Sequence, residues 1–207
     1  MRDLEQQIIL YGALVVAVIL HEISHGVMAL AYGDDTAKRA GRLTLNPLPH
    51  LDPVGSILLP AMAVLANLPV LGWAKPVPVN PARMRNPRAN MLVVGLVGPG
   101  TNFALMLGAA FWARSLWEGG DVGRMLDVAW SFALINLFLG VFNMLPIPPL
   151  DGSSLIERVL PARALPGWHR FRPYGFLVLF AGLFMFDIFG RIIHPFAEVL
   201  ERFVFGG

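Results

Sequence analysis

The residues with the clearest chemistry lie near the start of the chain, where His21, Glu22 and His25 form the pattern H-E-x-x-H. In a helix, a spacing of four residues places both imidazoles on one face, one turn apart. Two neutral imidazole nitrogens so placed can bind one Zn2+, and Glu22 can take a proton from water that attacks a peptide carbonyl. The pattern predicts a hydrolytic metal site with one Zn2+ per chain.

The surroundings of this motif strengthen the interpretation. His21, Glu22 and His25 lie inside the apolar stretch from Ile8 to Tyr32, which is long enough to cross a membrane. Ionisable side chains in such a stretch are costly unless they pair, bind metal or face water. The alternative is a polar cluster whose members satisfy one another between helices.

A catalytic zinc site usually has three protein ligands and one open position. The chain has no cysteine, so the third ligand must be His, Asp or Glu. Asp151 is the most promising, because it follows an apolar stretch and a proline-rich run that forces an extended chain. The alternative role for Asp151 is a helix cap that opens a loop. The candidates are His50, Asp52, Asp151, Glu157, Asp187 and His194.

The elements that must position these residues are predicted to be membrane helices. The 207 residues are 56% hydrophobic and only 14% charged, whereas soluble domains carry about 25% charged residues. The lipid bilayer is therefore the expected environment, and the net charge of +2 indicates no nucleic-acid partner. No cleavable signal peptide is expected, because no small-residue cleavage motif follows the first apolar run.

The predicted fold is an all-α polytopic membrane protein with about four spanning helices, a re-entrant or interfacial segment, and short β-strands near the active site. The re-entrant segment is Val54 to Gly72, and the strands are Arg42 to Leu45 and Lys75 to Val79. Pro195 is expected to kink or break the chain after the last span. The spans are Ile8 to Tyr32, Met91 to Ala113, Val128 to Leu145, and Tyr174 to about Ile193.

One membrane domain, residues 1–207, is expected, with a catalytic core at about 8–152 and a C-terminal helix and tail at about 174–205. His25 lies about 10 Å from the Tyr32 end of its helix, and Asp151 lies just beyond the end of its own. If His25 and Asp151 bind the same metal ion, these two ends must face the same side of the membrane. This favours a re-entrant course for the segment Val54 to Gly72.

The distribution of basic residues then predicts the orientation of the chain. By the positive-inside rule, the side with most Lys and Arg is cytoplasmic, so the active site should open towards the cytoplasm with the N-terminus outside. Arg2, Arg124 and Arg202 are expected on the other side. The basic residues expected together are Lys38, Arg39, Arg42, Lys75, Arg83, Arg85, Arg88, Arg158, Arg163, Arg170 and Arg172.

Together, the HEISH motif and the later segment N-x-x-P-x-x-x-L-D-G resemble the site-2 protease family of intramembrane zinc metalloproteases. The second motif runs from Asn143 to Gly152. This resemblance implies zinc held by His21, His25 and Asp151, with Glu22 as general base. It also implies a transmembrane protein as substrate and a multi-pass location in the cell membrane. The compact branch of the family is expected, without PDZ or CBS domains.

Two asparagines are further candidates. Asn102, in the run Gly98-Pro-Gly-Thr-Asn102, and Asn143 are expected to contact substrate or the developing oxyanion. For the run containing Asn102, helix packing allowed by its glycines is an equal alternative. The segment from His50 to Gly55 also resembles the compact branch, and an Asx turn explains Asp52-Pro53 equally well.

The sequence leaves two rival functions open. It gives no prediction of the oligomeric state. A membrane metal transporter would need ligands along a continuous path through more helices than this chain offers. A non-catalytic metal-binding scaffold would not need Glu22, which is present. A further hypothesis is that a locally unwound substrate pairs, as an added strand, with the segments Arg42 to Leu45 or Lys75 to Val79. The equal alternative is that these segments are plain connecting loops.

Overall fold

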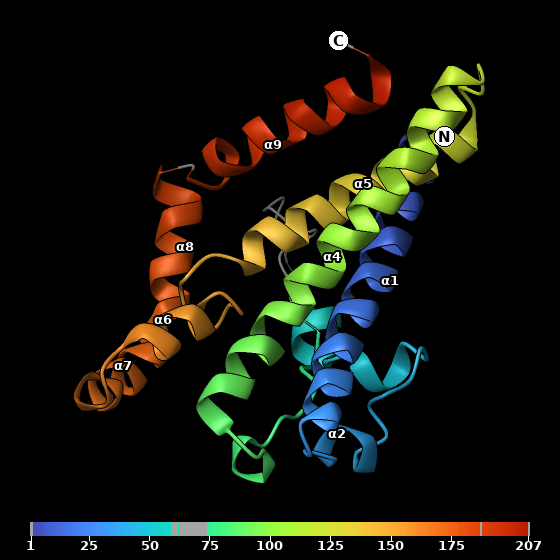
Figure 1. The fold of residues 1–207 in the computed structure, drawn as a ribbon. Coiled ribbons are helices and arrows are strands. Elements are labelled where there is room, and N and C mark those ends of the chain that lie inside the picture. Colours follow the sequence, from blue (N-terminus) through green and yellow to red (C-terminus); the bar gives the residue numbers. More distant parts are fainter. Residues whose placement is uncertain (1, 59–61, 63–73, 187, 207) are drawn as a thin grey trace.

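The computed structural model describes residues 2–58, 62, 74–186 and 188–206. Its centre is a bundle of three long helices: α1 (Arg2–Ala31), α4 (Pro87–Glu118) and α5 (Arg124–Asn143). Each pair of these helices is in contact, and all three run roughly along one direction (Figure 1). Within the described part of the chain, these are the three helices long and apolar enough to cross a membrane. The first three predicted spans are confirmed as helices of sufficient length and apolarity.

Small side chains let the long helices approach closely. Ala109, Ala110 and Ala113 of α4 pack against Ala129 and Ala133 of α5, and all five are buried. Membrane helices associate through such contacts, because lipid provides no hydrophobic driving force between helices. The result is a rigid bundle on which side chains at membrane depth can be held in place.

The first helix ends where the chain leaves the bundle. Gly33 has a φ of +101°, and the amide of the next residue, Asp34, bonds back to Ala29 O at 2.9 Å. A glycine with positive φ after the last helical turn is a common helix terminator. The chain then forms the short helix α2 (Thr36–Arg39) and a 3-10 turn, Leu48–His50, and a π-helical turn follows at Pro53–Leu58. A further 3-10 turn, Pro81–Arg83, precedes α4.

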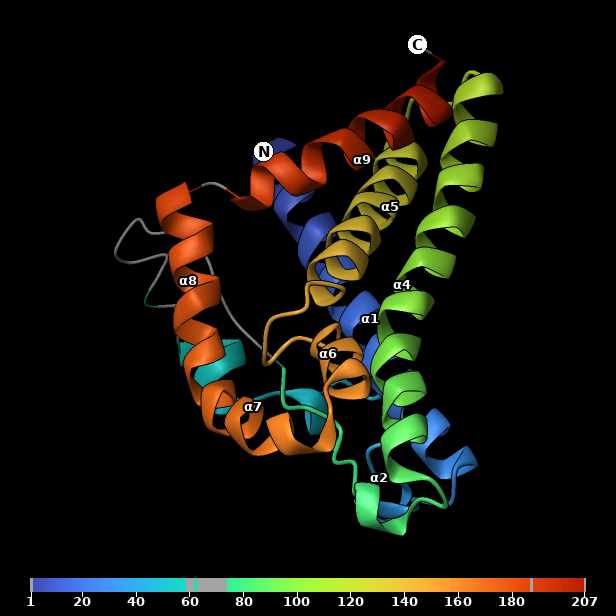
Figure 2. The same ribbon diagram turned by 60° about the vertical axis from the view of Figure 1, so that its left-hand side comes forward.

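The C-terminal part has two short helices and then two longer ones. These are α6 (Ser153–Val159), α7 (Leu165–Phe171), α8 (Gly175–Phe186) and α9 (Ile188–Phe205), with 3-10 turns at Ala162–Ala164 and Arg172–Tyr174. In Figure 2, α8 stands to one side of the bundle and α9 crosses it near the C-terminal end of α4. Leu200 and Val204 of α9 belong to the core formed with α4 and α5.

The fourth predicted span is not confirmed. The stretch from Tyr174 to Ile193 is divided between α8 and α9, and α8 has 12 residues. At 1.5 Å per residue, α8 is about 18 Å long, which is short of a bilayer core of about 30 Å. Pro195 lies inside α9, so the two helices separate earlier in the chain than the predicted break.

The predicted strands are not confirmed. None of the described residues forms a strand: residues 43–45 bend, and residues 75–79 have no regular secondary structure. Pro76 and Pro78 have no amide hydrogen to contribute to a ladder, and the two segments are joined by the Arg42 side chain instead. Most of the predicted re-entrant segment, 54–72, lies outside the described residues.

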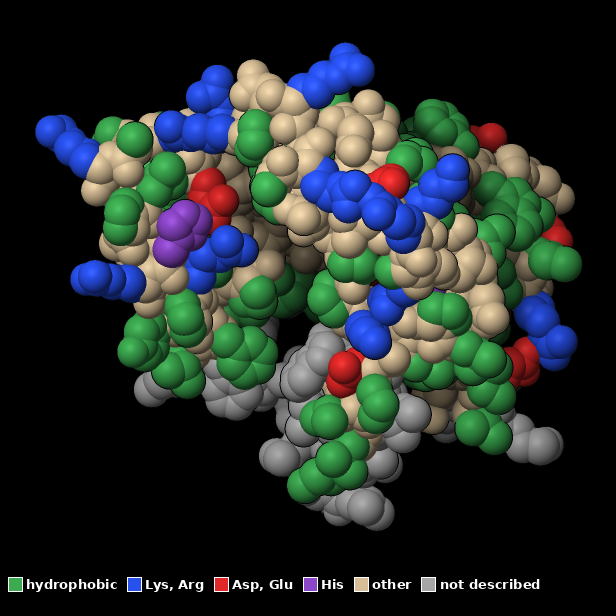
Figure 3. All heavy atoms as spheres, turned by 90° about the horizontal axis from the view of Figure 1, so that it is seen from below, with side chains coloured by type: hydrophobic (Ala, Val, Ile, Leu, Met, Phe, Trp, Pro, Cys, Tyr) green, Lys and Arg blue, Asp and Glu red, His purple; other side chains and the backbone are tan. Residues whose placement is uncertain are grey.

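Basic side chains gather at one end of the molecule. Figure 3 shows this end from below, with Lys and Arg spread across it. Contacts tie the basic segments together there: Arg83 pairs with Asp35 at 3.2 Å, and Arg88 donates to Arg158 O at 3.0 Å. Both ends of the chain lie at the opposite end of the bundle (Figures 1 and 2).

Candidate active site

The two histidines of the HEISH motif point from α1 towards α4. Both side chains are buried, and the Nε2 atoms of His21 and His25 lie 3.0 Å apart. Their rings are nearly perpendicular, with centroids 4.7 Å apart. The four-residue spacing therefore brings the two imidazole nitrogens to one point, as the sequence predicts.

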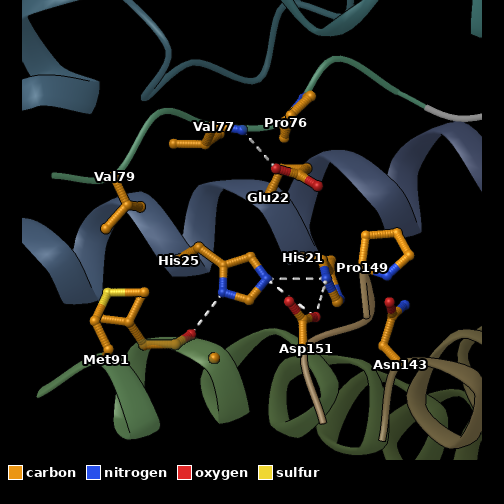
Figure 4. Close-up of a pocket in the computed structure, with 12 residues that line it drawn as sticks. His21, Glu22, His25, Pro76, Val77, Val79, Met91, Asn143, Pro149 and Asp151 are labelled. Atoms are coloured by element: carbon orange, nitrogen blue, oxygen red, sulfur yellow. Dashed lines mark hydrogen bonds and ion pairs between the residues drawn. The ribbon is translucent and has the colours of Figure 1, made fainter. Parts of the chain in front are cut away.

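Asp151 reaches the same point from the loop after α5. Its Oδ2 lies 3.0 Å from His21 Nε2 and 3.3 Å from His25 Nε2. The loop is closed by a hydrogen bond of 2.7 Å from Gly152 N to Asn143 O, the last residue of α5. Figure 4 shows the three side chains converging.

The hydrogen bonds of the two Nδ1 atoms determine the protonation of the Nε2 atoms that face Asp151. His21 Nδ1 lies 2.6 Å from Asn102 Oδ1, and His25 Nδ1 lies 2.6 Å from the carbonyl oxygen of Val94. Both partners are acceptors, so each Nδ1 carries the proton and donates it. Each Nε2 then presents a lone pair towards Asp151 Oδ2.

This donor set fits zinc. Two lone pairs and a carboxylate oxygen at 3.0 to 3.3 Å repel one another unless a cation lies between them. In a tetrahedral zinc site with bonds of about 2.0–2.1 Å, ligand atoms are separated by about 3.3 Å. His21, His25 and Asp151 form the one group of three potential metal-binding residues found in the described part of the chain.

Two glycines of α4 make room for this group. An added Cβ at Gly98 would lie 2.4 Å from His25 Nε2, and one at Gly95 would lie 2.5 Å from Ser154 Oγ and 3.2 Å from Asp151 O. The two glycines are three residues apart and therefore share a face of α4. The packing role suggested for the glycine run thus has a specific place, directly against the histidine rings.

Glu22 lines the same cavity as the two histidines. Its Oε2 accepts a hydrogen bond of 2.8 Å from the backbone N–H of Val77. The cavity is about 250 Å3 and is lined by His21, Glu22, His25, Pro76, Val77, Val79, Met91, Val94, Gly95, Asn143, Pro149 and Asp151. The carboxylate and the three converging atoms therefore share one cavity (Figure 4).

The extended segment beside Glu22 is held by polar groups that sequence reasoning did not assign. The buried Arg42 donates to Lys75 O at 2.5 Å and to Pro76 O at 3.3 Å. Asp34 Oδ2 accepts from Asn80 N at 2.6 Å. Asp34 lies beyond the end of α1. Burial raises its pKa, but hydrogen bonds from Thr36 and Asn80 outweigh this effect and keep the pKa below the usual value.

The two candidate asparagines have different places. Asn102 is fully buried behind His21 and does not line the pocket, so its position favours orienting His21 over contacting substrate. Asn143 lines the pocket, and its Nδ2 donates to Leu139 O at 3.0 Å. Asn136 was not predicted from the sequence. The signal that could have identified it is a polar asparagine inside the apolar stretch from Val128 to Leu145.

The other metal-ligand candidates are not part of this group. His50 Nε2 lies 3.0 Å from Thr44 O, and Asp52 Oδ1 accepts from the amides of residues 54 and 55, which is an Asx turn. Glu157 bonds Trp168 Nε1, and His194 pairs with Glu198. Asp187 lies outside the described residues.

Two buried histidines on an apolar helix, with a half-buried Asp151 from the loop after α5, define a membrane protein with a metal centre. Comparisons with known proteins identify the family. Residues 121–186, which include Asp151, match the model of peptidase family M50. The chain is 37% identical to the "Putative zinc metalloprotease YwhC" of Bacillus subtilis (strain 168), over 88% of this chain and 82% of that protein. The chain belongs to peptidase family M50 and is a zinc metalloprotease of the site-2 type.

More distant relatives agree. The "Putative zinc metalloprotease Rip2" of Mycobacterium tuberculosis (strain H37Rv) is 33% identical over 80% of this chain and 63% of that protein. The protein of the same name from Mycolicibacterium smegmatis is 28% identical over 83% and 65%. The chain therefore spans about two thirds of these relatives. A comparison with solved structures gave no significant match.

Proposed function

We propose that this protein hydrolyses a peptide bond in or near a transmembrane segment of a membrane-protein substrate. The observation that carries the proposal is the convergence of His21 Nε2, His25 Nε2 and Asp151 Oδ2 within 3.3 Å, in a cavity shared with Glu22. One zinc ion would be held by His21, His25 and Asp151. When bound, it supplies a Lewis acid that polarises the peptide carbonyl and lowers the pKa of water.

Glu22 performs the proton transfers. It takes a proton from the attacking water, and it then gives that proton to the amine that leaves when the peptide C–N bond breaks. One oxygen of its carboxylate is held by the Val77 N–H, which fixes the side chain without removing its second oxygen from the cavity. Asn143 lines the same cavity and is a candidate contact for substrate.

The depth of the site supports a substrate within the membrane. His25 lies six residues before the end of α1, or about 9 Å along the helix axis. A substrate helix hides its peptide bonds inside its own turns, so it must unwind locally to be cut. No hydrogen bond to the backbone N–H or C=O of Val79 is found among the described residues, and an unwound substrate can pair there as an added strand.

The basic end of the molecule supports an orientation in the cell membrane. Because Lys and Arg concentrate in cytoplasmic loops, the end that carries α2 and the start of α4 would face the cytoplasm. The site then opens on the cytoplasmic side, with the N-terminus outside. The lipid bilayer and a transmembrane protein are the proposed partners.

Glu22→Gln tests the proposal. The variant should bind zinc as the wild type does and lose cleavage of a transmembrane reporter, by about 100-fold or more, because the general base is gone. Glu198→Gln, at an exposed glutamate of α9, is the matched control and should cleave normally. Undiminished cleavage by Glu22→Gln would contradict the proposal, and zinc flux in vesicles without cleavage would indicate a transporter.

A further inference from the structure

A chain of hydrogen bonds leads from the metal group through all three long helices. His21 Nδ1 donates to Asn102 Oδ1 at 2.6 Å, and Asn102 Nδ2 donates to Asn136 Oδ1 at 2.9 Å. Asn136 Nδ2 then donates to the backbone carbonyl of Phe132 at 2.8 Å. Asn102 and Asn136 are completely buried. The chain thus joins α1, α4 and α5 out of contact with water.

The last acceptor determines the direction of every bond in this chain. A carbonyl oxygen can only accept, so Asn136 must turn its NH2 group towards Phe132 and its oxygen towards Asn102. Asn102 must then turn its own NH2 group towards Asn136 and its oxygen towards His21. An amide oxygen beside Nδ1 requires the proton of His21 to be on Nδ1.

The opposite direction would disable the metal site. If both amides were rotated, Asn102 would present an NH2 group to His21 Nδ1, and the ring proton would move to Nε2. A protonated Nε2 cannot bind a metal ion. Rotation would also place the oxygen of Asn136 against the Phe132 carbonyl, where two acceptors face each other in a buried site.

We propose that Asn136 is a positioning residue of the zinc site, which acts through Asn102 to hold the His21 ring with Nε2 free for the metal. This inference rests on the proposed ligand set. It assigns a specific role to a polar residue that contacts neither the metal group nor the pocket. Partners that orient metal-binding histidines typically change metal affinity by 10- to 100-fold when they are removed.

Two substitutions of Asn136 separate this role from simple packing. Leucine has the same branched shape and number of side-chain heavy atoms but no polar atom. A threonine hydroxyl can donate to the carbonyl four residues earlier and still accept from Asn102. Asn136→Leu should weaken zinc binding by about tenfold. Asn136→Thr should have a zinc affinity closer to that of the wild type. Zinc affinity is measured on the purified full chain by competition with a chelator of known affinity.

A double-mutant cycle with Asn102→Ala tests whether Asn136 acts through Asn102. If it does, Asn136→Leu should weaken zinc binding in the wild type and have little further effect once Asn102 is alanine. An equal loss in both backgrounds, or no loss in the wild type, would overturn the inference. Thermal unfolding of the metal-free proteins checks folding, and Asn136→Ala takes the place of leucine if that variant does not fold.

The ligand variants distinguish this inference from the proposed function. Asp151→Asn and His25→Ala should both lower zinc affinity strongly. If they do and Asn136→Leu binds zinc normally, only the role of Asn136 is wrong. If Asp151→Asn keeps normal zinc affinity, the ligand set itself is wrong.

Discussion

The backbone N–H of Val77 donates a hydrogen bond of 2.8 Å to Glu22 Oε2, across 55 residues of sequence. The proposed general base is therefore oriented by the same extended segment that borders the cavity. Asp34 and Arg42 hold that segment at positions 75, 76 and 80. The placement of the base and the shape of the substrate cleft are thus linked physically.

Val77→Pro should slow cleavage by removing this donor. Without the hydrogen bond, Glu22 can leave its position, and we expect kcat to fall by about 10- to 100-fold, a part of what a general base contributes. Val77 already lies between two prolines, so the extended backbone can be kept. Val77→Ala keeps the N–H and should have near-normal kcat. Zinc content should be normal in both, and a normal kcat for Val77→Pro would show that the bond does not orient Glu22.

Val79→Pro tests the pairing of substrate with the extended segment. Its N–H is the donor that an added strand would use, so its loss should raise KM for a transmembrane reporter several-fold and leave zinc content unchanged. Val79→Ala keeps the N–H and is the control. The pairing hypothesis is wrong if the two variants have the same KM.

Gly98→Ala should damage the metal site directly. Its Cβ would lie 2.4 Å from His25 Nε2 and 2.6 Å from His21 Cε1, so the rings or the helices must move apart. We expect zinc affinity to fall by at least about tenfold. Gly100→Ala on the same helix meets nothing within 4 Å and should bind zinc normally. Equal zinc affinities for the two alanine variants would contradict the packing shown by the structure.

Asp34 should make the stability of the loop beyond α1 depend on pH. Its lowered pKa stabilises the folded protein above the unfolded value of about 3.9, and this contribution is lost as the pH falls through the lower folded pKa. Asp34→Asn should therefore be less stable than the wild type at pH 7, and the difference should shrink at strongly acidic pH. Thermal unfolding at several pH values measures it. A difference that does not change with pH would exclude this contribution.

Labelling of single cysteines tests the proposed orientation, because the chain has no cysteine of its own. Lys38→Cys, in α2, should react only with reagents that reach the cytoplasmic side. Val122→Cys, in the exposed loop between α4 and α5, should react from outside the cell. The reverse pattern would show that the site opens away from the cytoplasm.

Local sequence patterns were sufficient for the first three long apolar helices and for half of the site. The first three spans follow from apolar length, because an apolar helix must be about 20 residues long to cross the bilayer. His21 and His25 share a helix, so their spacing alone places them together. Spacing alone could not place Asp151. The prolines before it suggested that the chain folds back towards the helices, and its role as a ligand came from the resemblance of the two motifs to a known family.

Pairings between distant segments could not be predicted in the same way. The segment from Lys75 to Val79 alternates like a strand, but pairing depends on a partner and on amide hydrogens that its prolines lack. The stretch from Tyr174 to Ile193 is apolar enough to span, yet the packing of α9 on α4 and α5 accompanies its division into two helices.

The sequence by itself determined the chemistry of this protein: a helical HEISH motif, a second motif ending in Asp151, and apolar helices that hold both. Only the tertiary structure decided how those groups are oriented. The Val94 carbonyl and the Asn102–Asn136 chain set the histidine rings, and Val77 sets Glu22. Val77, Val94 and Asn102 lie 55 to 81 residues from the groups they contact, and no local periodicity encodes contacts between separate elements.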